Sequence, residues 1–137
     1  GWEGAEANGA QKFENMGQRD DAAVVTMATA VAFHEAIGPE VVEARTRALA
    51  AAVKTGWRDA IANVRFHTPL KPEMSGGVVV FSLPGGRHRE VFQQVYETHG
   101  LGCAAMGGAF DGIRISPHIY NTMEEVGVAV DAIAEYA

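Results

Sequence analysis

The chain has 137 residues, of which 47% are apolar and 20% charged, a composition that excludes a disordered protein and predicts a domain with its own core. Its 17 acidic residues outweigh its 11 basic ones, so we expect neither a nucleic-acid nor an anionic-membrane partner. No apolar run approaches the roughly 18 residues that a membrane span requires.

Residues 1–19 are rich in glycine and alanine and predict an extended lead-in without a core of its own. A single α+β domain is expected over residues 20–137. Asp20 and Asp21 are typical N-cap residues, and they predict the start of an Ala-rich helix that runs to about Ile37. The apolar stripe of this helix comprises Val24, Ala28 and Val31.

Gly38 ends the first helix, and Pro39 begins a second one at a position where its missing N–H is tolerated. This second helix is predicted to be long and amphipathic. Its apolar face comprises Val42, Leu49, Val53, Trp57 and Ile61.

The rest of the chain alternates between short strands and helices. Strands are predicted at residues 64–67, 77–83 and 101–106 and around Arg114, the second of them central because it is almost continuously apolar. Helices are predicted at residues 87–99 and after Thr122. The order α-α-β-β-α-β-β-α predicts a small, mostly antiparallel sheet of three to four strands with helices packed on one face.

The most informative segment is R-I-S-P-H-x-Y-N-T-x-E-E, residues 114–125. Ile113 and Ile115 alternate with Arg114, which is the period of a strand with one apolar face. Proline at position 117 stops the strand, and the T-x-x-E pair at 122 and 125 predicts a capping box that opens the last helix. An arginine held at such a turn offers a planar fork of donors that suits a carboxylate.

This segment resembles the class V aminotransferases, which are pyridoxal-phosphate enzymes of fold type I, near the isopenicillin-N epimerase and cysteine desulfurase branches. The resemblance implies that the chain is the C-terminal small domain of such an enzyme and that Arg114 holds the α-carboxylate of an amino-acid substrate. His118 would lie near the substrate. The alternatives are a surface arginine on an edge strand and a structural histidine that closes the turn.

The lead-in segment K-F-E-N-M-G-Q-R-D, residues 12–20, is similar to the family pattern R-F-E-x-G-T-Q, which reaches the cofactor phosphate of the other subunit. Gly17 and Gln18 are therefore candidate cofactor-binding residues. Met16 and Gly17 stand where the family has glycine and threonine, so the hydroxyl of that pattern is missing. The alternative is an ordinary loop before a helix.

The residues that would perform the family's chemistry are not found in this sequence. The Schiff-base lysine must be desolvated or lie near other cations, and it belongs to an earlier part of the family's fold. The three lysines here have other settings: Lys12 in the lead-in, Lys54 in a part of the second helix expected to be solvated, and Lys71 in a proline-flanked loop. We therefore assign no catalytic residue, expect no cofactor on this chain alone and predict that it is inactive by itself.

Other patterns in the sequence favour structural roles. Cys103, the single cysteine, fits a reducing compartment and a small buried hydrophobe better than a nucleophile. Residues 85–89, G-G-R-H-R, would bind an anion at a helix start or form a solvated turn, and the turn is favoured. No histidine pair has a metal-ligand spacing, so no metal site is expected.

Two functions from different classes remain open at this stage. The first is a carboxylate-binding domain of a pyridoxal-phosphate enzyme, acting in a cytoplasmic homodimer. The second is a stand-alone, non-catalytic binding or interaction domain derived from the same fold. The residues present do not choose between transamination, racemisation, desulfuration and lysis, and whether the chain is itself an enzyme stays open.

Overall fold

The computed structural model describes residues 20–137 of the chain. The chain divides into two units, Gly1–Ala36 and Ile37–Ala137. Helix α1 (Asp21–Ile37) begins where the sequence predicts, because the Asp20 carboxylate accepts a hydrogen bond from the Ala23 N–H at 3.1 Å. No side chain of α1 is buried. That residues 20–137 form a single domain stays a prediction. The predicted lead-in at residues 1–19 lies outside the described residues.

Helix α2 (Pro39–Ala60) is the long element of the second unit. Gly38 precedes it with φ of +99°, a conformation that favours glycine, and Pro39 occupies the first turn as predicted. The predicted apolar face is confirmed at four positions that are buried in the core: Leu49, Val53, Trp57 and Ile61.

The sheet has four strands in the order β1-β2-β4-β3, and every neighbouring pair is antiparallel. The strands are β1 (Arg65–Phe66), β2 (Val79–Ser82), β3 (Ala104–Met106) and β4 (Gly112–Ile115). The predicted α+β class and element order are confirmed. The strands β1, β2 and β3 are each shorter than the predicted ranges of residues 64–67, 77–83 and 101–106.

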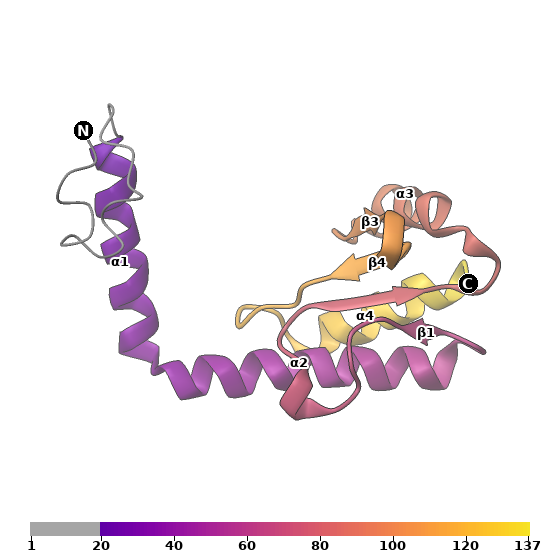
Figure 1. Ribbon diagram of the computed structural model, residues 1–137, viewed down its shortest axis with the longest axis horizontal. Helices are drawn as coiled ribbons and strands as arrows, with labels where there is room; N and C mark the ends of the chain where they lie inside the picture. Colours follow the sequence, from indigo (N-terminus) through magenta and orange to yellow (C-terminus); the bar gives the residue numbers. More distant parts are fainter. Residues whose placement is uncertain (1–19) are drawn as a thin grey trace, which may run out of the picture. The chain divides into compact units, whose positions relative to one another are not determined.

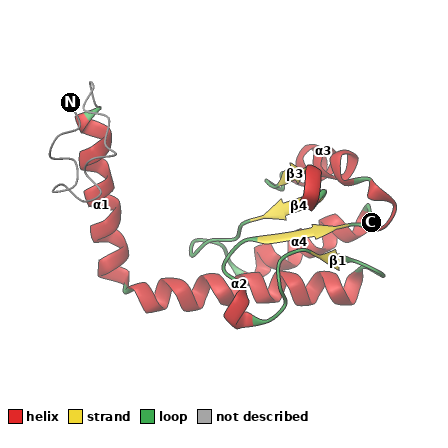
Figure 2. Cartoon of the chain, viewed as in Figure 1, coloured by secondary structure: helices red, strands yellow, loops and turns green. Residues whose placement is uncertain are grey.

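Helices α3 (His88–His99) and α4 (Met123–Glu135) complete the layer with α2 (Figure 2). The Trp57 ring lies 4.1 Å from the Phe81 ring, centroid to centroid, and joins α2 to β2. Side chains of α2, α3 and α4 share one core cluster with alternate residues of β2 and β4. The ribbon shows β2 running between β1 and β4 (Figure 1). The opposite face of the sheet, which we call the open face, carries the intervening residues Val80, Ser82 and Arg114.

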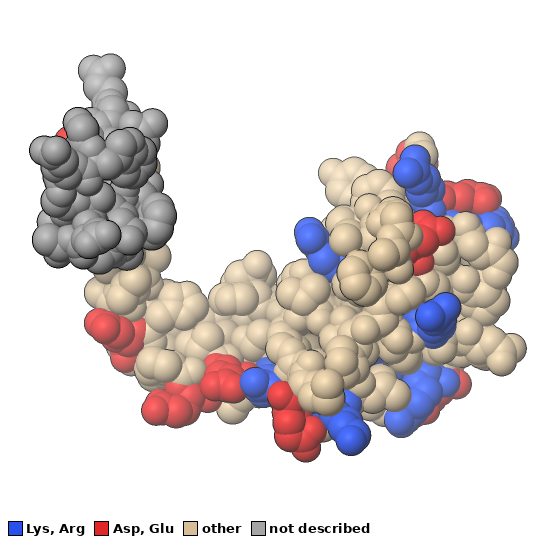
Figure 3. Space-filling view, viewed as in Figure 1, with Lys and Arg blue, Asp and Glu red and all other residues tan. Residues whose placement is uncertain are grey.

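Charge is mixed over the surface of the described residues. On the side shown in Figure 3, Lys and Arg lie interspersed with Asp and Glu. Among the helices of residues 20–137, none taken singly is long and apolar enough to cross a membrane. Helices α1 and α2 meet the length and composition only as a pair, with a break between them.

Candidate functional site

Arg114 projects from β4 onto the open face. Its neighbours Ile113 and Ile115 are 0% and 8% exposed in the core, whereas Arg114 is exposed, so the parity expected from the sequence is confirmed. In the sheet register Arg114 pairs with Val80 of β2 on one side and Ala104 of β3 on the other. The guanidinium therefore emerges from the middle of the sheet between two small apolar neighbours.

The guanidinium of Arg114 has no hydrogen bond or ion pair within residues 20–137. Arg65 and Arg89 likewise have no such partner within residues 20–137, whereas several other arginines of this part are engaged. Arg45 donates to a backbone carbonyl, Arg47 holds a loop, and Arg87 forms an ion pair with Glu90 at 2.6 Å. The donors of Arg114 are thus available to a group outside the described residues.

The turn that follows β4 is organised by Asn121. Its side-chain oxygen accepts a hydrogen bond from the His118 N–H at 2.9 Å, and its own N–H donates to the His118 carbonyl at 2.8 Å. The Asn121 carbonyl accepts from Nη2 of Arg45 at 2.7 Å, which fixes the turn to α2. His118 is half-buried, with its ring 5.2 Å from that of Tyr120. The structure thus places both predicted substrate-binding residues, Arg114 and His118, on one strand and the turn after it.

The predicted capping box is confirmed at the start of α4. The Thr122 hydroxyl accepts from the Glu125 N–H at 3.1 Å, and the Glu125 carboxylate accepts from the Thr122 N–H at 2.8 Å. The hydrogen bond from the Thr122 backbone, together with one from the Asn121 side chain, lowers the pKa of Glu125.

Lys54 is the clear error of the sequence prediction. It is 6% exposed rather than solvated, and its ammonium donates to the Ser75 hydroxyl at 2.6 Å and the Pro69 carbonyl at 3.1 Å. Burial lowers its pKa. The loop at residues 69–76 folds back over α2 and covers this side chain, which a helical pattern does not reveal. Arg47 holds the same loop through the carbonyls of Pro72 and Ser75.

The described residues do not fit a covalently bound pyridoxal phosphate. The Lys54 ammonium donates its two hydrogen bonds to the loop at residues 69–76. Lys71 is an exposed residue of the same loop, next to the short 3-10 helix η2 (Pro72–Met74). Lys12 lies outside the described residues, as do the candidate cofactor-binding residues Gly17 and Gln18. No step of cofactor chemistry therefore rests on these residues.

Two further candidates behave as structural groups. Burial raises the pKa of the half-buried Cys103 thiol to about 11, so it stays protonated at neutral pH and is a poor nucleophile. Arg87, at the start of α3, is paired with Glu90, which agrees with the favoured turn at residues 85–89. Within residues 20–137, no group of three or more His, Cys, Asp or Glu side chains is placed to hold a metal ion.

A polar cluster on the open face was missed by the sequence reasoning. Nε2 of His67 lies 2.6 Å from the Ser82 hydroxyl, which donates to the Asp111 carbonyl at 2.5 Å. The cluster ties the residues after β1 to the segment that enters β4. Its signal in the sequence was parity, because Ser82 alternates with the buried Phe81 and must face away from the core.

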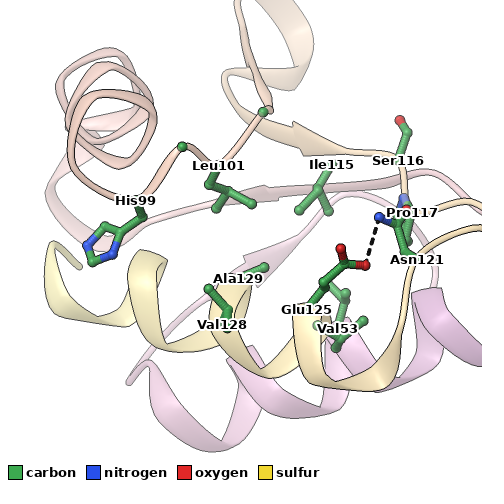
Figure 4. Close-up of a pocket in the computed structure, with 13 residues that line it drawn as sticks. Val53, His99, Leu101, Ile115, Ser116, Pro117, Asn121, Glu125, Val128 and Ala129 are labelled. Carbon is green, nitrogen blue, oxygen red and sulfur yellow. Dashed lines mark hydrogen bonds between the residues drawn. The ribbon is translucent and has the colours of Figure 1, made fainter.

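The sheet's other side holds a pocket of about 360 Å³ (Figure 4). Its walls come from α2, the residues just after α3, the end of β4 and the start of α4. Ser116, Pro117 and Asn121 line it, but Arg114 and His118 do not. The predicted site and the pocket therefore lie on opposite sides of the segment that leaves β4.

Comparisons with known proteins place this fold among enzymes. The chain is 30% identical over 128 residues to isopenicillin N epimerase of Streptomyces clavuligerus, a match that covers 91% of the chain and 32% of that protein. An apo structure of cysteine desulfurase from Thermococcus onnurineus NA1 matches with a TM-score of 0.79 and 22% identity, over 93% of the chain and 33% of that structure. No family model matches the sequence.

The chain thus spans about a third of the length of each relative. The cysteine desulfurase comparison shows the shared fold, and the sequence relationship to the epimerase extends over most of the chain. The first relative is named as an isopenicillin N epimerase and the second as a cysteine desulfurase, the two branches that the motif at residues 114–125 resembles. The chain is a class V aminotransferase-like domain, equivalent to a part of such enzymes.

Proposed function

We propose that the chain is the C-terminal, carboxylate-binding domain of a pyridoxal-phosphate-dependent class V aminotransferase-like enzyme and is inactive alone. The observation that carries this proposal is the guanidinium of Arg114, which is exposed on the open face and has no partner among the described residues. An unpaired arginine between two apolar neighbours is suited to a ligand carboxylate, because it forms two parallel hydrogen bonds.

The residues on either side of Arg114 in the sheet strengthen its hydrogen bonds to a carboxylate. Val80 and Ala104 are half-buried and offer no competing acceptor side chain to the guanidinium. When a second layer covers the open face, water is excluded from around the pair, and charge-assisted hydrogen bonds gain strength in a less polar surrounding. His118, on the turn that Asn121 organises, would contact the same substrate.

The intact enzyme would bind an amino acid as substrate and pyridoxal phosphate as cofactor, the latter through a part of the enzyme other than residues 20–137. Gly17 and Gln18 are proposed to approach the cofactor phosphate of a partner subunit in a homodimer. A cytoplasmic location is proposed from the single cysteine. The alternative, a stand-alone binding domain, predicts a start codon close to Gly1 rather than an upstream lysine-containing domain.

The test compares Arg114→Lys with Arg65→Lys in the longer parent protein. Arg65 is the matched control, because it is exposed and is paired with Ser82 in the sheet register. Losing the fork at Arg114 removes a charge-assisted hydrogen bond worth about 1.5–3 kcal/mol, so amino-acid affinity should fall by roughly 10- to 100-fold. Cofactor loading should stay unchanged, and Arg65→Lys should bind the amino acid as the parent does.

Equal amino-acid affinity of the parent and Arg114→Lys would overturn the carboxylate role. An upstream reading frame without a lysine-containing domain would instead overturn the proposal that the chain belongs to a longer enzyme. The two outcomes are read from separate measurements, so each part of the proposal is tested by itself.

A further inference from the structure

The pocket on the helix-covered side is not lined by Arg114 and is not explained by its proposed carboxylate role. Its volume of about 360 Å³ is at the lower end of small-molecule sites. Its floor is apolar and is made by Val53 of α2, Ile115 of β4 and Ala129 of α4, with Leu101 at the side (Figure 4). A ligand that fills it therefore needs a compact hydrocarbon body.

One end of the pocket presents a carboxylate. Figure 4 shows the Glu125 side chain rising from α4 toward Ile115, with the Asn121 amide beside it. Oε2 of Glu125 accepts hydrogen bonds from the Thr122 N–H at 2.8 Å and from Nδ2 of Asn121 at 3.3 Å. Within residues 20–137, no hydrogen bond reaches the second oxygen, Oε1. Because these hydrogen bonds lower the pKa of Glu125, the carboxylate is ionised at neutral pH.

The other end of the pocket adds little positive charge. His99 lines it, and Nε2 of His99 lies 3.2 Å from the carboxylate of Glu135, whose negative charge offsets any charge on the ring. Gly100 and Gly102 form the wall between and contribute no side chain. Among the described residues that line the pocket there is no lysine or arginine. The ionised carboxylate of Glu125 thus makes the charge of the pocket lining negative.

We propose that this pocket binds a small organic ammonium group with an apolar body. The ammonium donates to Oε1 of Glu125, and the hydrocarbon body packs on Val53, Ile115 and Ala129. The ligand is either a free primary amine or the side chain of a lysine from a longer polypeptide. The site lies on the other side of the sheet from Arg114 and is independent of the carboxylate role.

The test is a titration of the 15N-labelled chain with three probes of one shape: cyclohexylammonium, cyclohexanol and cyclohexanecarboxylate. Backbone amide signals of Leu101, Ile115 and Glu125 should shift and saturate with cyclohexylammonium. The apparent Kd should be at least about tenfold lower for the ammonium than for the carboxylate, which corresponds to roughly 1.4 kcal/mol. Equal affinities, or shifts confined to the open face, would overturn the proposal without any variant being made.

Two variants localise the charge that selects the ligand. Glu125→Gln removes the charge but keeps a side chain that completes a capping box, so the fold is preserved. Glu124→Gln is the matched control, since it removes an exposed carboxylate from the same helical turn but does not line the pocket. Glu125→Gln should lose the preference for the ammonium, and Glu124→Gln should keep it. A full preference in Glu125→Gln would refute the role of this carboxylate.

The same titration of a longer parent protein shows whether the ammonium group belongs to a free amine or to a lysine side chain. A free amine as ligand predicts that cyclohexylammonium binds both the chain and the parent. A lysine side chain already in the pocket predicts that it binds the chain and is excluded from the parent.

Discussion

Replacing Gly112 by alanine should disrupt the strand that carries Arg114. Gly112 is buried at the start of β4 and pairs with Met106 of β3. A Cβ added to it would lie 2.2 Å from the carbonyl oxygen of Phe81 and 2.9 Å from the carbonyl carbon. Gly112 is not among the glycines with positive φ, so the requirement here is for space and not for an unusual backbone conformation.

The size of the effect follows from that distance. Ordinary contact of a Cβ begins at 3.4 Å, so β2 and β4 would have to separate locally by roughly 1 Å. Overpacking of this kind costs about 1–3 kcal/mol, and we expect the upper end because the obstructing atom is backbone and is held by the sheet. For a domain of this size, about 3 kcal/mol lowers Tm by roughly 12–24 °C.

The assay is thermal and urea denaturation followed by circular dichroism, with Gly102→Ala as the matched control. A Cβ at Gly102 meets no atom within 4 Å, and Gly102 is likewise absent from the positive-φ glycines, so this variant should melt at or slightly above the parent temperature. If Gly112→Ala melts within a few degrees of Gly102→Ala, the strands are not held as closely as described, and the reasoning fails.

Four further predictions concern the chain alone. With pyridoxal phosphate it should show no turnover and no stoichiometric borohydride labelling of Lys12, Lys54 or Lys71 by peptide mapping; such labelling with turnover would refute its inactivity. At high concentration it should be dimeric by light scattering, because α1 exposes Val25, Met27 and other apolar side chains; a strictly monomeric species would count against this. Thr122→Ala should lower the free energy of unfolding by about 1 kcal/mol in urea, while serine at this position should be tolerated; an unchanged midpoint for alanine would contradict the capping role. Because burial lowers the pKa of Lys54 below 10.5, the unfolded chain binds more protons between the folded pKa and 10.5. Stability should therefore rise with pH through that window, and Lys54→Met should flatten this dependence; parallel curves would disprove it.

The sequence predicted most where a local pattern decides the structure. The Thr122–Glu125 capping box and the Gly38–Pro39 break between helices depend on side chains within a few residues of each other, and both are present as predicted. The orientation of Arg114 followed from parity alone, because Ile113 and Ile115 have to enter the core.

The sequence predicted least where distant segments meet. Lys54 is buried because a loop that begins 15 residues later supplies a carbonyl and a hydroxyl that accept hydrogen bonds from its ammonium. The link between His67 and Ser82 depends on the pairing of β1 with β2, and the pocket depends on contact between α2, α4 and the end of β4. Such contacts leave no periodic signal in the chain.

The strand order β1-β2-β4-β3 has a consequence for how the chain folds. Strand β3 pairs only with β4 in this sheet, and β4 pairs with both β3 and β2, so the sheet closes only when residues 112–115 insert between two segments made earlier. The pairing of β2 with β4 is non-local, and non-local pairing slows folding. During synthesis Arg114 acquires its two neighbours only after residues 79–115 have all left the ribosome. A partly folded chain in which β4 is unpaired would therefore leave β3 without a partner strand and Arg114 without its neighbours Val80 and Ala104.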